Sequence, residues 1–183
     1  MRIGRHLPRL TLLSCTLLFT TALEASGWKI FTSPPGGFSV AMPRDPERHE
    51  SIHQSFLGPI RENTYSVTTE GGSYSVEYSD LPGLAVNLGG SWLIFNKAKE
   101  GVLKDKGGAE TDFRSISLGK HPGRALSFHV PGKPSGKAHF FLVEKRLYVL
   151  VATSSSPANV ETFLSSFKLL QTGTKETRAS SVS

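Results

Sequence analysis

Residues 138–170 read AHFFLVEKRLYVLVATSSSPANVETFLSSFKLL, and this stretch decides the fold. It opens with two apolar runs, residues 140–143 and 147–151, in which consecutive side chains are all apolar. A strand that is apolar on both faces must be covered on both faces, so the two runs are predicted to be strands in the middle of a sheet. The charged residues Glu144, Lys145 and Arg146 are expected to connect them.

The second half of this stretch predicts a helix over residues 157–169. Ser156 is suited to the N-cap position, and Pro157 is the residue best tolerated in the first helical position. Apolar residues then recur at the spacing of one helical face: Val160, Phe163, Leu164 and Phe167. This face is expected to pack on the sheet.

Short strands separated by turns precede this stretch. The clearest is residues 73–80, where Tyr74, Val76 and Tyr78 alternate with small or charged residues. Weaker patterns predict strands near residues 28–31, 38–42, 51–57, 60–69, 110–118 and 124–130. Glycine and proline clusters between the segments favour an antiparallel arrangement.

One helix is predicted in the middle of the chain, over residues 91–106. Apolar residues recur there at three- and four-residue spacing, namely Trp92, Phe95, Ala98 and Val102. Ser91 is a suitable N-cap and Gly107 a stop, whereas residues 81–90 are expected to be an apolar loop. The predicted fold class is therefore α+β, an α/β/α-like sandwich with a central antiparallel sheet of about six to nine strands.

The N-terminus has the pattern of an export signal. Arg2, Arg5 and Arg9 precede an apolar run over residues 10–23 and then small residues, so residues 1–25 are predicted to be a signal peptide. Export would place the mature chain in the periplasm or outside the cell, without a transmembrane span. Lipoprotein anchoring through Cys15 is a less favoured alternative, because the apolar run continues past the cysteine.

The remainder of the chain is predicted to be one domain, residues 28–170, followed by a disordered polar tail over residues 171–183. The full chain carries a formal charge of +6, and loss of the signal peptide leaves about +4. Cys15 is the only cysteine of the chain, so the mature protein has no thiol for a disulfide or a cysteine-ligated metal. We expect no nucleic-acid partner and no cofactor.

His49, Glu50 and His53 form a literal H-E-x-x-H sequence, which is the signature of zinc-dependent hydrolases. In such enzymes the two histidines bind zinc and the glutamate activates water, which requires a helix that places the histidines one turn apart. On a strand the same side chains would lie about 13 Å apart. The favoured interpretation is a polar surface segment, and the zinc hydrolase is kept as an alternative function.

Five residues of the C-terminal half are candidates for an interaction surface: Lys120, His121, Arg124, Lys133 and Lys137. Together they would attract an acidic partner or an anionic envelope surface, although ordinary solvated side chains are the simpler interpretation. Tyr74, Tyr78 and Trp92 are expected in the core rather than in a stacking site. Residues 81–88 are expected to be either buried under the first helix or exposed as a contact patch.

Several motifs resemble a known family. They are WKIFTSPPGGFSVAMP at residues 28–43, SYSVEYSDLP at 73–82, PGRA at 122–125, RLYVLVA at 146–152 and FLSSFKL at 163–169. With the export signal, these motifs look like small bacterial exported proteins of the PsbP-like or DcrB-like kind. Those proteins are similar in fold to the lumenal PsbP protein of photosystem II and to the Ran-binding nuclear import factor Mog.

The resemblance covers about residues 28–170 and implies a central antiparallel sheet sandwiched by helices. It also implies an accessory or protein-binding role without catalytic activity, in which an unidentified protein of the cell envelope is the partner. The shared motifs are turns and core positions, so no photosystem-binding or Ran-binding residue carries over to this chain.

Overall fold

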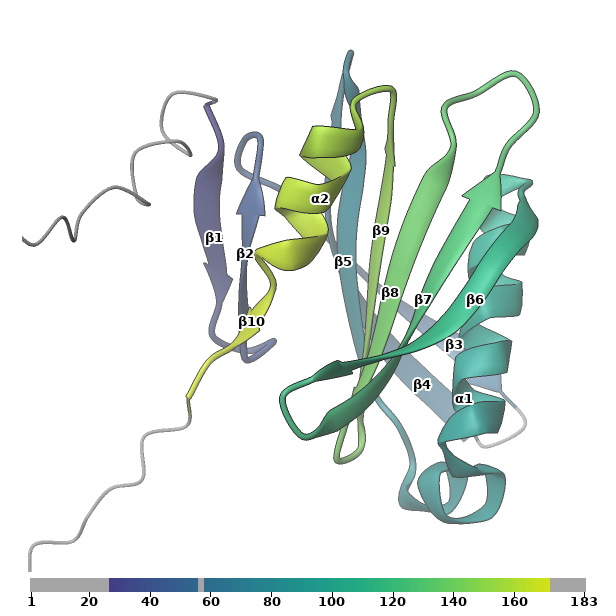
Figure 1. Cartoon of the computed structure of the whole chain (residues 1–183). Coiled ribbons are helices and arrows are strands. Elements are labelled where there is room, and N and C mark those ends of the chain that lie inside the picture. Colours follow the sequence, from purple (N-terminus) through teal and green to yellow (C-terminus); the bar gives the residue numbers. More distant parts are fainter. Residues whose placement is uncertain (1–26, 56–57, 172–183) are drawn as a thin grey trace, which may run out of the picture.

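The computed structural model describes residues 27–55 and 58–171, and these form two antiparallel sheets and two helices (Figure 1). The predicted signal peptide and residues 172–183 of the predicted tail lie outside the described residues. The larger sheet contains β3 (Glu47–Ser55), β4 (Gly58–Thr69), β5 (Gly72–Asp80), β6 (Ala109–Leu118), β7 (His121–His129), β8 (Gly136–Val143) and β9 (Arg146–Ser154). Its spatial order is β3-β4-β5-β9-β8-β7-β6, which confirms the predicted α+β fold class.

The two apolar runs lie at the centre of this sheet, as predicted, because β9 is the middle strand and β8 is its neighbour. Consecutive side chains of β9 enter two separate cores. Tyr148, Leu150 and Ala152 belong to one core, whereas Leu147, Val149 and Val151 belong to the other. Burial on both faces explains why this strand has no polar alternation.

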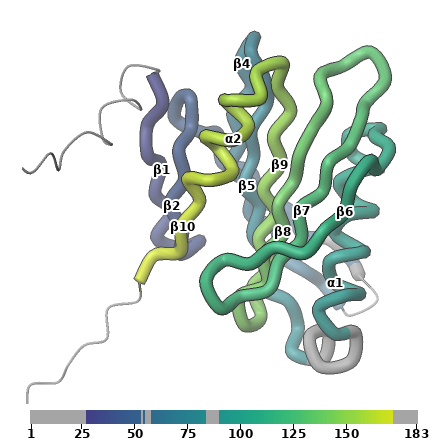
Figure 2. The backbone as a smooth tube through the Cα atoms, viewed as in Figure 1, coloured from purple at the N-terminus to yellow at the C-terminus, as the bar shows by residue number. Residues whose placement is uncertain are grey.

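Each face of the large sheet is covered by different elements (Figures 1 and 2). On one face, here called the α2 face, α2 (Pro157–Ser165) packs on β8 and β9. Phe163 of α2 is completely buried there, against the ring of Tyr74 at 5.5 Å. On the opposite α1 face, α1 (Gly83–Lys106) contacts β7 and β8 and buries Phe95.

A small second sheet completes the α2 face, with β1 (Lys29–Ser33), β2 (Phe38–Met42) and β10 (Lys168–Leu169) in the order β1-β2-β10. The prediction of a helix as far as residue 169 was wrong, since α2 ends at Ser165. The Ser166 hydroxyl accepts a hydrogen bond from the backbone N–H of Ala41 at 2.8 Å. Residues 168 and 169 then pair with the edge of β2 that β1 leaves open. This pairing supplies backbone hydrogen bonds in place of those that a longer helix would make.

The first helix begins earlier than predicted. Residues 81–90 were expected to be a loop, but the helix starts at Gly83 and is broken only at Gly90, whose φ of 59° and ψ of 166° are not helical. Gly107 stops the helix, as predicted, and this C-cap residue has the left-handed conformation. The prediction of a buried Trp92 was wrong, because this side chain is 67% exposed. Neither of the described helices is long and apolar enough to cross a membrane.

Candidate functional site

The H-E-x-x-H sequence lies on strand β3, in the middle of its pairing with β4. His49 pairs with Thr64, and His53 pairs with Ile60. The two histidines are four positions apart on an extended strand, so their backbones lie about 13 Å from each other. The helical geometry that the zinc hydrolase alternative requires is therefore absent from this segment, and the polar-strand interpretation is the one that the structure supports.

Glu50, the glutamate that would activate water in the zinc hydrolase alternative, forms ion pairs with two arginines. Its carboxylate accepts a hydrogen bond from Arg61 of β4 and another from Arg48 Nη2 at 3.2 Å. Within residues 27–55 and 58–171, no group of three or more histidine, cysteine, aspartate or glutamate side chains is placed to hold a metal ion. Glu50 acts here as a cross-strand ion-pair partner.

The structure distributes the five predicted interaction residues over two ends and two faces of the sheet. Lys120 and His121 lie at the turn between β6 and β7. Lys133 follows the other end of β7, a strand of nine residues that spans about 30 Å, and Lys137 lies on β8 beside this end, in register with Ser127. Arg124 points to the α1 face, where its guanidinium lies 5.5 Å from the ring centre of Phe113. The five residues therefore do not form one continuous basic surface.

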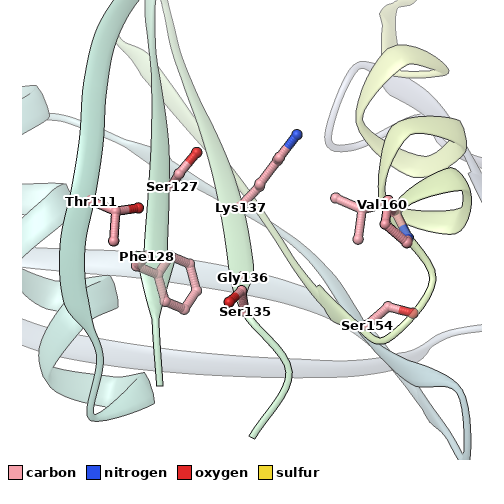
Figure 3. Close-up of a pocket in the computed structure, with 9 residues that line it drawn as sticks. Thr111, Ser127, Phe128, Ser135, Gly136, Lys137, Ser154 and Val160 are labelled. Atoms are coloured by element: carbon pink, nitrogen blue, oxygen red, sulfur yellow. The ribbon is translucent and has the colours of Figure 1, made fainter. Parts of the chain in front are cut away.

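Lys137 is the one of these residues that lines a cleft on the α2 face. This cleft has a volume of about 190 Å³ and lies between α2 and strands β7 and β8 (Figure 3). Its lining residues are Thr111, Ser127, Phe128, Ser135, Gly136, Lys137, Ser154, Pro157 and Val160. Figure 3 shows the Lys137 side chain between Ser127 of β7 and Val160 of α2. The cleft thus combines one ammonium group and several hydroxyls with an apolar wall.

The absence of a side chain at Gly136 shapes this cleft. A Cβ atom at this position would lie 2.1 Å from Cζ of Phe128, which is far closer than atoms can approach. The Phe128 ring is only 1% exposed and fills the space beside the strand. Gly136 therefore allows the first residue of β8 to lie directly against an aromatic ring.

A second cleft of about 350 Å³ opens on the other side of the β7–β8 loop. Its lining residues are Ser73, Asp105, Lys106, Val130, Lys133, Pro134 and Thr153. Lys106 is paired with its neighbour Asp105 at 2.8 Å, which offsets part of the local charge. The β7–β8 loop, which contains Lys133, and the start of β8, which contains Lys137, therefore lie between two small recesses at one end of the sheet.

His139 lies two residues beyond Lys137 and faces the same side of the sheet. It pairs with Leu150 of β9 and stands edge-on to Phe141 at 5.9 Å. Burial lowers the pKa of His139 to about 4, and Arg114 and Lys137 act in the same direction while Glu161 opposes them. Its Nδ1 atom is buried without a hydrogen-bond partner among the described residues. The imidazole is therefore neutral at pH 7.

Glu77 also has a strongly shifted pKa, and it lies on the opposite face. It pairs with Val149, whose side chain belongs to the core under α1. Burial, together with the carboxylates of Glu62 and Asp105, raises the pKa of Glu77 to about 8. The sheet therefore separates the imidazole of His139 from the carboxyl group of Glu77.

Sequence reasoning identified Lys137 but missed the other lining residues. Thr111 sits at a register shift between Glu110 and Asp112, which no periodicity predicts. Ser127 is a polar residue in a strand of alternating pattern. Solvent-facing residues have the same pattern, so it does not mark Ser127 as part of a cleft. The SGK sequence around Gly136 contained the only available signal, because a glycine at the start of a strand marks a close approach.

Comparison with known proteins bears on the fold. No protein-family model and no curated protein sequence matches the chain. Among solved structures, the chain is similar to the solution structure of cyanobacterial PsbP (CyanoP) from Synechocystis sp. PCC 6803. The match covers 87% of this chain and 98% of that one, with a TM-score of 0.54 and 10% sequence identity. The likeness confirms a PsbP-like fold, and at this identity it extends to the fold alone.

Proposed function

We propose that this chain is a non-catalytic accessory domain of the cell envelope that acts by binding another protein. The separation of its perturbed groups carries the proposal. Among the described residues, Glu77 and His139 are the carboxyl and imidazole groups with large pKa shifts, and they lie on opposite faces of the sheet. Acid–base catalysis needs such groups to converge on one cavity, which they do not do here.

The size of the clefts supports the same conclusion. Sites for small molecules usually enclose about 300–1,000 Å³. The cleft beside Lys137, with about 190 Å³, is below this range, and the cleft beside Lys133, with about 350 Å³, is at its lower end. Recesses of this size suit one or two side chains of a protein partner. The likeness to a PsbP fold adds support, because the motifs that resemble this family imply an accessory role.

We further propose that the chain reaches the envelope through its N-terminal signal. N-terminal sequencing of the protein from a fractionated source cell tests this. The expected mature chain begins near residue 26 and is recovered outside the cytoplasm. Recovery of an uncut chain in the cytoplasm would contradict export.

Co-purification tests the binding role. A C-terminally tagged chain is expressed in the source organism, cross-linked in intact cells and purified, and co-purifying proteins are quantified. The expected result is one or a few envelope proteins in near-stoichiometric amounts. A tagged Phe163→Ala chain is the matched control, because loss of this fully buried ring should cost about 3–5 kcal/mol and unfold much of the protein. Proteins captured equally by both chains count against the proposal.

A further inference from the structure

We propose that the cleft beside α2 receives an acidic side chain from an extended segment of the partner protein, with Lys137 as its counter-charge. This inference rests on the proposed function and names the chemistry of the partner. Lys137 is exposed on β8 and lines the cleft together with Val160 of α2 (Figure 3). Across the part of the chain that the structure describes, its ammonium group has no ion pair.

The hydroxyl groups of the cleft complete a site for a carboxylate. Thr111, Ser127 and Ser135 line it without a side-chain hydrogen bond to another described residue. Ser154 differs, because its hydroxyl already donates to the carbonyl of Gly71 at 2.5 Å. A carboxylate accepts up to four hydrogen bonds, and the cleft offers it the Lys137 ammonium group and hydroxyls along its length.

The acidic residues nearest to the cleft do not neutralise Lys137. Asp112 lies across β7 from it, in register with Ser127, and its carboxylate is 3.8 Å from Arg114. Glu161 is exposed on α2 and influences His139. Neither carboxylate is paired with Lys137. The positive charge of this residue is therefore available to a partner.

The shape of the cleft favours a peptide over a membrane surface. Its walls are α2 on one side and strands β7 and β8 on the other, so a ligand has to enter between them (Figure 3). A flat layer of lipid headgroups binds charges that protrude from a protein surface, and it cannot enter a cleft between a helix and two strands. The apolar wall that Pro157 and Val160 of α2 form suits the methylene groups of a glutamate side chain.

The test measures binding of a fluorescein-labelled peptide of alternating glutamate and serine by fluorescence polarisation, at low ionic strength. Lys137→Ala should weaken binding about tenfold, since it removes the counter-charge of the buried carboxylate. Lys120→Ala is the matched control, because it removes the same charge from the exposed turn at the other end of the sheet. It should change binding less than twofold. A peptide with glutamine in place of glutamate should not bind.

Three results would overturn the inference. They are equal weakening by both lysine variants, binding of the glutamine peptide with the affinity of the glutamate peptide, and binding of phosphatidylglycerol vesicles without binding of the acidic peptide. The co-purification experiment separates this inference from the proposed function. If a partner co-purifies equally with wild-type and Lys137→Ala chains, the binding role stands and the cleft is not its contact. If no partner co-purifies with either chain, the binding role itself fails.

Discussion

Arg146 and Asp80 face each other across β9 and β5 and are joined by two parallel hydrogen bonds. Arg146 Nε donates to Asp80 Oδ1 at 2.6 Å, and Nη2 donates to Oδ2 at 2.7 Å. The remaining nitrogen, Nη1, donates to the backbone carbonyls of Pro35 and Gly36 at 3.0 and 3.2 Å. One side chain therefore ties the large sheet to the β1–β2 turn of the small sheet.

Replacement of Arg146 should measure this connection. Arg146→Lys keeps the charge but cannot make the paired bonds, and we expect it to lower the free energy of unfolding by about 1–2 kcal/mol. Arg146→Ala should cost about 2–3 kcal/mol, because it also removes the packing of the guanidinium on the Tyr78 ring at 4.8 Å. Urea denaturation of the variants checks both values. A loss below 0.5 kcal/mol for Arg146→Ala, roughly that of a solvated surface residue, would show that the contact is dispensable.

Two glycines should respond in opposite directions to the same substitution. Gly136→Ala places a methyl group inside the Phe128 ring and should lower the free energy of unfolding by about 2–3 kcal/mol. Gly101→Ala, inside α1, meets no atom within 4 Å and should raise stability by up to about 1 kcal/mol. Thermal unfolding monitored by circular dichroism compares the two. Similar melting temperatures for both variants would contradict the packing at Gly136.

The carboxyl group of Glu77 should make the protein less stable at alkaline pH. Its pKa rises from an ordinary 4.5 to about 8, so between these values the folded chain holds a proton that the unfolded chain has lost. The free energy of unfolding therefore falls as the pH rises through this window. Glu77→Gln should remove the decline and exceed wild type by about 2–4 kcal/mol at pH 9. Glu70→Gln, at an exposed turn, is the control, and a parallel pH profile for wild type and Glu77→Gln would refute the shift.

His139 should act in the opposite direction, at acidic pH. Its pKa falls from 6.5 to about 4, so the unfolded chain binds a proton in this window that the folded chain does not. Stability contributed by the neutral imidazole is present above pH 6.5 and declines as the pH drops towards 4. His139→Leu should therefore be more stable than wild type at pH 5 by about 1–2 kcal/mol, with a smaller difference at pH 7. His129→Leu, at an exposed position, should show no such dependence, and equal behaviour of both variants would count against the burial of His139.

The sequence predicted the elements whose patterns reflect their own burial. The strands around Tyr148 and Phe140 were recognisable because both of their faces are apolar, and the α2 face was recognisable from Val160, Phe163 and Leu164. The start of α2 also followed local chemistry, since the Ser156 hydroxyl accepts the Asn159 N–H at 3.4 Å. In each case the pattern that predicts the element lies within the element itself or next to it in the sequence.

The rest depended on contacts between distant segments. β10 forms because one edge of β2 is open to pairing. The sequence of residues 168 and 169 does not indicate that they pair with this distant strand. Trp92 has the spacing of a buried residue, but the side of α1 that packs on the sheet is set by Phe95, Ala98 and Val102. The cleft combines residues of β6, β7, β8, β9 and α2, so only Lys137 could be proposed from its charge. Residues that are far apart in the chain do not reveal a shared cavity through local periodicity.

The pairing of β10 with β2 has a consequence for the order in which this chain can fold. The hydrogen bond between Ala41 and Ser166 closes a loop with a sequence separation of 125 residues. Contacts of such long range form late and slowly, because a large loss of chain entropy precedes them. The β1–β2 hairpin is made early in synthesis, but its third strand exists only once residue 169 has been added. The growing chain therefore lacks a finished small sheet until residues 168 and 169 have been added, and a product truncated at residue 165 should never acquire one.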